Sequence, residues 1–174
     1  MNPKQNGPVW TDKAGLPADL WAGLERAADQ PRVLAWGEGA DGLVVAALTG
    51  GLAVHEDGQW RVHPWHEIGQ ARWDAEAGRL SWTTPEGGAE AMMTTPRRVP
   101  QVVKDRVEAS LVVDDRLTAP GNVPVIITAR RDLAAPDRPL IWAVGAVDGR
   151  TLDRPGVREA AEARLVELKA ELPL

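Results

Sequence analysis

The chain has 174 residues, of which 44% are hydrophobic, and a net charge of −5, a composition typical of a globular protein with a sizeable core. The negative charge disfavours a general nucleic-acid binder, because such proteins need a concentrated cationic face to displace counterions from phosphates. The sequence contains no cysteine, which excludes disulfides, thiolate nucleophiles and cysteine-based metal sites. No stretch approaches the roughly 20 apolar residues of a membrane span or resembles a signal peptide, so we expect a cytoplasmic protein.

The first third of the chain predicts a flexible arm and then a helix. Residues 1–15 are polar apart from Trp10 and carry glycine and proline, which is typical of a loose segment. From Leu16 onward the apolar residues recur three or four apart, and this spacing predicts one face of a helix that ends at Pro31. The residues of that face are Leu20, Trp21, Leu24, Ala27 and Ala28.

From Arg32 the period changes to two, which indicates strands. Turn dipeptides that favour positive φ angles separate the first segments, namely Asp41-Gly42, Gly50-Gly51 and Asp57-Gly58. Further turns follow at residues 76–78 and 86–88. The pattern predicts about seven short strands in about sixty residues, as in a meander that curls into a small barrel or sandwich.

A helix, a run of strands and a final helix are predicted after Pro96. Valines at positions 99, 102, 103 and 107 predict the first helix, and two or three strands are predicted from Ser110 onward. The last two strands are apolar on both faces, which indicates central strands covered on both sides. An amphipathic helix closes the chain, with Asp153 as its cap and Pro155 in its first turn. Its apolar stripe comprises Val157, Ala161, Leu165, Leu168 and Leu172.

The middle of the chain carries a family resemblance. Residues 33–109 hold seven short strands and a helix, with Pro64-Trp65-His66-Glu67-Ile68 at a corner. This segment resembles the bacterial pleckstrin-homology-like (PH-like) fold, whose members often carry a proline, a large residue and an isoleucine at this corner. The whole chain also resembles a family of proteins from high-GC bacteria that share the VLAW opening. The resemblance implies a binding or scaffolding fold rather than an enzyme, and it brings no reaction with it.

We therefore expect an α+β fold of mainly short antiparallel strands forming a PH-like barrel or sandwich, with an N-terminal helix and a C-terminal amphipathic helix. Residues 16–174 are expected to form a single globular domain. Its PH-like part covers residues 32–109. Residues 110–174 add strands and the last helix, and they either complete one larger sheet or form a lobe packed on it.

Three histidines are the candidate metal ligands. His63 and His66, with His55 nearby, lie close in sequence to several carboxylates, and imidazoles and carboxylates are the ligands that zinc would need in a chain without cysteine. Residues three apart on a strand point to opposite faces, so His63 and His66 converge only across a tight corner. Surface histidines beside a hairpin are the simpler interpretation, and we expect no cofactor.

Tryptophans and arginine pairs are the other candidate contacts. Four tryptophans fall at apolar strand positions and are expected in the core: Trp36, Trp73, Trp82 and Trp142. Trp65, on the corner beside His66, is the candidate exposed anchor for a partner protein, because an indole buries much area at a small entropic cost. The adjacent pairs Arg97-Arg98 and Arg130-Arg131 are candidate contacts for an anionic lipid, or else they are solvated ends of strands and helices.

The leading hypothesis is a non-catalytic binding or scaffold protein that meets an unknown protein partner through an edge strand or the Trp65 corner. A metal-binding enzyme or sensor that uses His63 and His66 is the first alternative. Peripheral binding to an anionic membrane is the second. Nucleic acid is not expected as a partner, and a homo-oligomer stays open.

Overall fold

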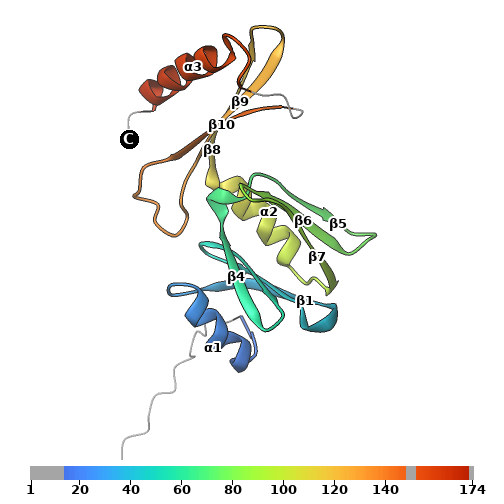
Figure 1. The fold of residues 1–174 in the computed structure, drawn as a ribbon. Coiled ribbons are helices and arrows are strands. Elements are labelled where there is room, and N and C mark those ends of the chain that lie inside the picture. The colour runs from blue at the N-terminus through green and yellow to red at the C-terminus, as the bar shows by residue number, and fades with distance from the viewer. Residues whose placement is uncertain (1–13, 148–151, 173–174) are drawn as a thin grey trace, which may run out of the picture. The chain divides into compact units, whose positions relative to one another are not determined.

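The computed structural model describes residues 14–147 and 152–172, so Trp10 and most of the expected N-terminal arm lie outside the described residues. The described chain is α+β, with three α-helices and ten strands in two antiparallel sheets (Figure 1). It divides into two compact units where the sequence predicts one domain. The first unit ends at Val107 and the second begins at Glu108.

The first unit is built on a seven-stranded sheet. Its strand order is β4-β3-β2-β1-β7-β6-β5, so within the described residues β4 and β5 are the two edges and the sheet does not close into a barrel. The alternating segments of the sequence correctly predict all seven strands. Their bounds are β1 (Val33–Gly39), β2 (Val44–Leu48), β3 (Gly51–Glu56), β4 (Gln59–Pro64), β5 (Ala71–Asp74), β6 (Arg79–Thr84) and β7 (Gly87–Thr95).

Two of the three predicted turn dipeptides act through positive φ angles. Asp57 and Gly58 have φ angles of 50° and 76° between β3 and β4, and Asp41 and Gly42 have φ angles of 54° and 79° between β1 and β2, as tight hairpin turns require. Gly51 serves a different purpose, because a Cβ at this position would lie 2.6 Å from the carbonyl oxygen of His63. The hairpin of β3 and β4 therefore needs glycine there for close backbone approach.

The predicted N-terminal helix is α1 (Ala18–Ala27), and it covers one face of β1 to β4. Trp21 and Leu24 are its buried residues, which matches the predicted apolar face. The indole Nε1 of Trp60 on β4 donates to the carbonyl of Leu20 at 3.1 Å. The core between helix and sheet comprises Leu16, Trp21, Leu24, Val33, Trp36, Val44, Ala46, Leu48 and Ala53.

The valine-rich segment after Pro96 forms α2 (Val99–Ser110), as predicted. It runs beside β5, β6 and β7 (Figure 1). Val99, Val102 and Val103 are buried, so tertiary burial overrides the preference of valine for strands.

The corner after β4 lies in the core. Its backbone makes a single turn of 3₁₀ helix over Trp65–Glu67, and both Trp65 and Ile68 are 0% exposed. The Nε1 of Trp65 donates to the carbonyl of Leu48 at 3.0 Å. A buried indole needs such a partner for its N–H group, and β2 provides it.

The second unit is a three-stranded sheet covered on one face by a helix. The strand order is β10-β9-β8, with β8 (Leu111–Ala119), β9 (Val123–Arg130), β10 (Ile141–Ala146) and helix α3 (Val157–Glu171). The core between them comprises Ala119, Val123, Val125, Ile127, Val157, Ala161 and Leu168. The sequence predicts that β9 and β10 are both central strands covered on both faces. β9 is central, but its residues mostly alternate between buried and half-buried. β10 is an edge strand, and Ile141 on it is 42% exposed.

The start of α3 differs from the prediction. Gly156, with a φ of 78°, occupies the N-cap position without a side-chain hydrogen bond, and Asp153 instead pairs with Arg158 at 2.8 Å. The turn after Pro155 thus places the helix start later than the expected cap. Leu172 is 38% exposed, so the buried stripe is shorter than predicted.

One ion pair joins α3 to β8. The guanidinium of Arg164 donates to both carboxylate oxygens of Asp115 at 3.0 Å, and this bond holds the pKa of Asp115 below its ordinary value. None of the helices in the described part of the chain is long and apolar enough to cross a membrane.

Candidate binding cavity

The structure does not support Trp65 as an exposed anchor. The indole is fully buried and bonded to Leu48, so the prediction of a partner contact through Trp65 is wrong. The cause is the 3₁₀ turn after Pro64, which turns the ring inward where a simple corner was expected to turn it outward. His66, the other predicted contact residue, is half-buried in the same turn.

The three histidines do not form one cluster. His55 pairs with Trp60, and His63 pairs with Leu52, in the ladder of β3 and β4. Because Trp60 and His63 are three residues apart on one strand, these pairs face opposite sides of the sheet. Within residues 14–147 and 152–172, no three histidine, aspartate or glutamate side chains come together as a metal-binding group. The geometry therefore gives no support to a site of His55, His63 and His66.

In each arginine pair, one guanidinium already contacts other side chains of the same unit. The guanidinium of Arg97 lies 3.8 Å from the ring centroid of Trp36 and 3.5 Å from a carboxylate oxygen of Glu38. Arg130 is buried and donates to the Oγ of Ser110 at 2.8 Å, and its burial lowers its pKa. Arg98 is exposed and Arg131 half-buried. The pairs thus offer fewer available cations for a lipid headgroup than the sequence indicates.

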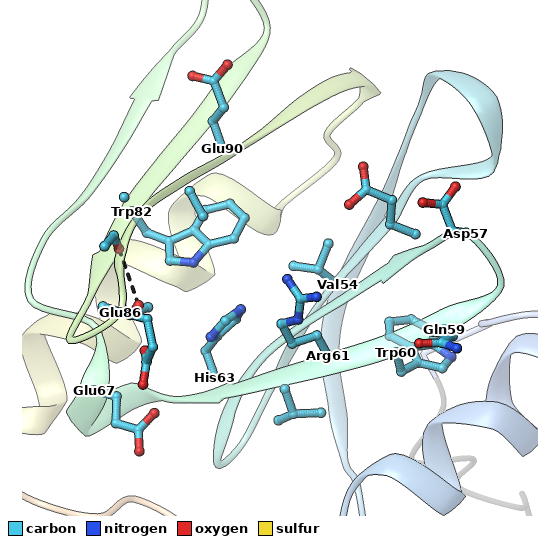
Figure 2. Close-up of a pocket in the computed structure, with 16 residues that line it drawn as sticks. Val54, Asp57, Gln59, Trp60, Arg61, His63, Glu67, Trp82, Glu86 and Glu90 are labelled. Atoms are coloured by element: carbon cyan, nitrogen blue, oxygen red, sulfur yellow. Dashed lines mark hydrogen bonds between the residues drawn. The ribbon is translucent and has the colours of Figure 1, made fainter.

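The first unit contains a cavity of about 600 Å³. One wall is the hairpin of β3 and β4, and the other is the hairpin of β6 and β7 (Figure 2). Trp60, Arg61 and His63 line it from β4, and Trp82 lines it from β6. We call this space the hairpin cavity.

The rim of the hairpin cavity is acidic. Five carboxylates line it against one guanidinium, that of Arg61. The carboxylates belong to Glu56, Asp57, Glu67, Glu86 and Glu90, all of which are exposed. A concave site lined by one sign of charge concentrates ions of the opposite sign, so the cavity favours a cationic occupant.

His63 adds little positive charge to this rim near neutral pH. Burial lowers its pKa below the ordinary value of 6.5, and Arg61 lowers it further, while Glu67 and Glu86 act in the opposite direction. The imidazole is therefore mainly neutral at pH 7. A hydrogen bond from Thr84 lowers the pKa of Glu86, so that carboxylate is ionised.

Trp82 supplies the inner wall. Its side chain is only 4% exposed, and among the described residues its Nε1 has no hydrogen-bond acceptor. Figure 2 shows the nitrogen-bearing edge of the indole directed toward His63 and Glu86, and the ring centroids of Trp82 and His63 are 6.0 Å apart. A buried donor without an acceptor is uncommon in native proteins and costs about 1–3 kcal/mol.

The sequence indicates part of this site. Its patterns mark His63 as a candidate metal ligand and Trp82 as a core residue, but they do not mark Arg61, Glu86 or Glu90. Pairing within two separate hairpins brings these residues together. A glutamate in a turn, such as Glu86, carries no local sequence signal that it lines a cavity.

No protein-family model, curated protein or solved structure matches this chain. The hairpin cavity is thus the main guide to function.

Proposed function

We propose that the protein is a non-catalytic binding protein that takes up a segment of another protein along β4 and in the hairpin cavity. The observation that carries this proposal is the position of β4. It pairs with β3 on one side only, so it is an edge of the sheet, and its residues Trp60 to His63 line the cavity.

An edge strand offers backbone groups to an incoming chain. A peptide added beside such a strand gains main-chain hydrogen bonds, and pockets for alternate side chains give it specificity. The hairpin cavity is such a pocket, with Trp82 in its wall. A recognition surface that combines an open edge with an aromatic wall suits a peptide better than a small metabolite.

We further propose that the first unit is a PH-like domain. Seven antiparallel strands followed by α2, with the proline-tryptophan corner between β4 and β5, support this assignment. The open edges at β4 and β5 differ from the closed barrel that the resemblance implies. Under this proposal the open edge at β4 is the binding feature.

Selection from a library of random displayed peptides tests the proposal. Ala89 is exposed, lines the cavity and lies opposite Trp82 in the ladder of β6 and β7, so Ala89→Trp should fill the cavity without disturbing the core. We expect peptides that bind the wild-type protein and lose at least about tenfold in affinity against this variant, which corresponds to about 1.4 kcal/mol.

The matched control is Ala75→Trp, because Ala75 is exposed in the turn between β5 and β6 and does not line the hairpin cavity. Selected peptides should bind this control as they bind the wild type. If no peptide is enriched, or if enriched peptides bind all three proteins equally, the proposal is wrong.

A further inference from the structure

We propose that the hairpin cavity recognises an arginine or lysine side chain of the bound segment, and that Trp82 donates a hydrogen bond to a backbone carbonyl of the same segment. This inference rests on the proposed function and names the chemistry of its partner, a basic stretch of protein chain.

The first support is the arrangement of charge. Glu67 approaches from the 3₁₀ turn after β4, and Glu86 approaches from the turn between β6 and β7. Burial and Arg61 lower the pKa of His63, and both carboxylates oppose this effect. Figure 2 shows both carboxylates on the same side of that ring. A guanidinium or ammonium group held there would meet two carboxylates, which suits charge-assisted hydrogen bonds.

The second support is the indole of Trp82, which is independent of the charges. Its Nε1 is a donor that lacks an acceptor among the described residues, in a side chain that is 4% exposed. An N–H group gains nothing from a cation, so the occupant must also carry an acceptor. Peptide carbonyls lie within a few bonds of every arginine or lysine side chain.

These two requirements together favour a peptide over a free cation. A polyamine could satisfy Glu67 and Glu86, but it has no carbonyl for Trp82 and no backbone to pair with β4. The half-buried ring of His63 lies 6.0 Å from the indole of Trp82, centroid to centroid. Because the Nε1 of Trp82 is buried, a bound segment reaches it only if neighbouring side chains move.

The experiment uses the full chain and three probes. The first is a short blocked peptide of glycine and serine with one central arginine, and the second is the same peptide with citrulline, which keeps the shape but not the charge. The third is spermidine, a free polyamine. Affinities are measured by calorimetry at low and at physiological salt.

We expect the arginine peptide to bind at least about tenfold more tightly than the citrulline peptide and more tightly than spermidine, with affinity that falls as salt rises. The double variant Glu67→Gln/Glu86→Gln should weaken the arginine peptide by about tenfold. Its matched control, Glu25→Gln/Glu76→Gln, removes the same charge from exposed positions outside the cavity. This control should retain the affinity of the wild type.

Three results would overturn the inference. They are equal binding of the arginine and citrulline peptides, equal losses in the two double variants, and binding of spermidine as tightly as the arginine peptide. The proposed function and this inference can be distinguished. If the displayed peptides lose affinity for Ala89→Trp but carry no arginine or lysine, the binding function stands and the cationic specificity is wrong.

Discussion

Replacing Trp65 by alanine should cost about 3–5 kcal/mol of unfolding free energy, the range for deletion of a buried aromatic side chain. Trp65 is 0% exposed and its Nε1 donates to the carbonyl of Leu48, so the substitution leaves both a cavity and an unpaired carbonyl. Urea denaturation followed by circular dichroism measures the loss.

Two further variants separate these causes. Trp65→Phe keeps most of the ring but leaves the Leu48 carbonyl without its donor, and we expect a loss of about 1–3 kcal/mol. Met92→Ala is the surface control, because Met92 is 48% exposed, and its stability should change by about 0.5 kcal/mol or less. A loss below about 1 kcal/mol for Trp65→Ala would show that the indole is not a core residue.

The second large effect is expected at Gly39, where β1 meets β7. A Cβ at this position would lie 2.2 Å from the carbonyl oxygen of Met92 and 2.5 Å from the side chain of Leu43. The β1–β7 pairing joins β2, β3 and β4 to β5 and β6. Gly39→Ala should therefore force these strands apart and destabilise the protein by about 3 kcal/mol, the upper end of the usual overpacking range.

Gly88→Ala is the matched control within the same sheet. A Cβ at Gly88 would lie 4.0 Å from the carbonyl oxygen of Trp82, an ordinary contact, so we expect a change of about 0.5 kcal/mol or less. Thermal and urea unfolding of both variants provide the comparison. Equal stabilities would contradict the close approach of β1 and β7 at Gly39.

Local patterns were sufficient to predict the elements of this fold. Period-two alternation marks all seven strands of the first unit, and helical spacing marks α1, α2 and α3. These signals are local because side-chain direction follows directly from backbone geometry. The predicted start of α3 is wrong because a left-handed glycine, Gly156, occupies the N-cap position, where the sequence predicts a side-chain cap by Asp153.

Burial across the sheet was harder to predict. The corner after Pro64 predicts Trp65 at the surface, but the acceptor that holds its indole inside belongs to Leu48, 17 residues earlier in the chain. The apolar strand position of Trp82 correctly predicts that it lies in the core. That its N–H group lacks an acceptor follows only from the three-dimensional surroundings of the ring. The residues of the hairpin cavity also come together only in three dimensions, because they belong to two separate hairpins.

The indole N–H resonance of Trp82 provides the most direct test of the central claim, that a basic protein segment occupies the hairpin cavity. The sequence has eight tryptophans, and Trp82→Phe assigns the relevant signal in a proton–nitrogen correlation spectrum. On titration with the arginine peptide, we predict that the Trp82 signal moves downfield and that its exchange with solvent slows, as its Nε1 gains an acceptor. A Trp82 signal that stays in place while the peptide is bound would contradict this account.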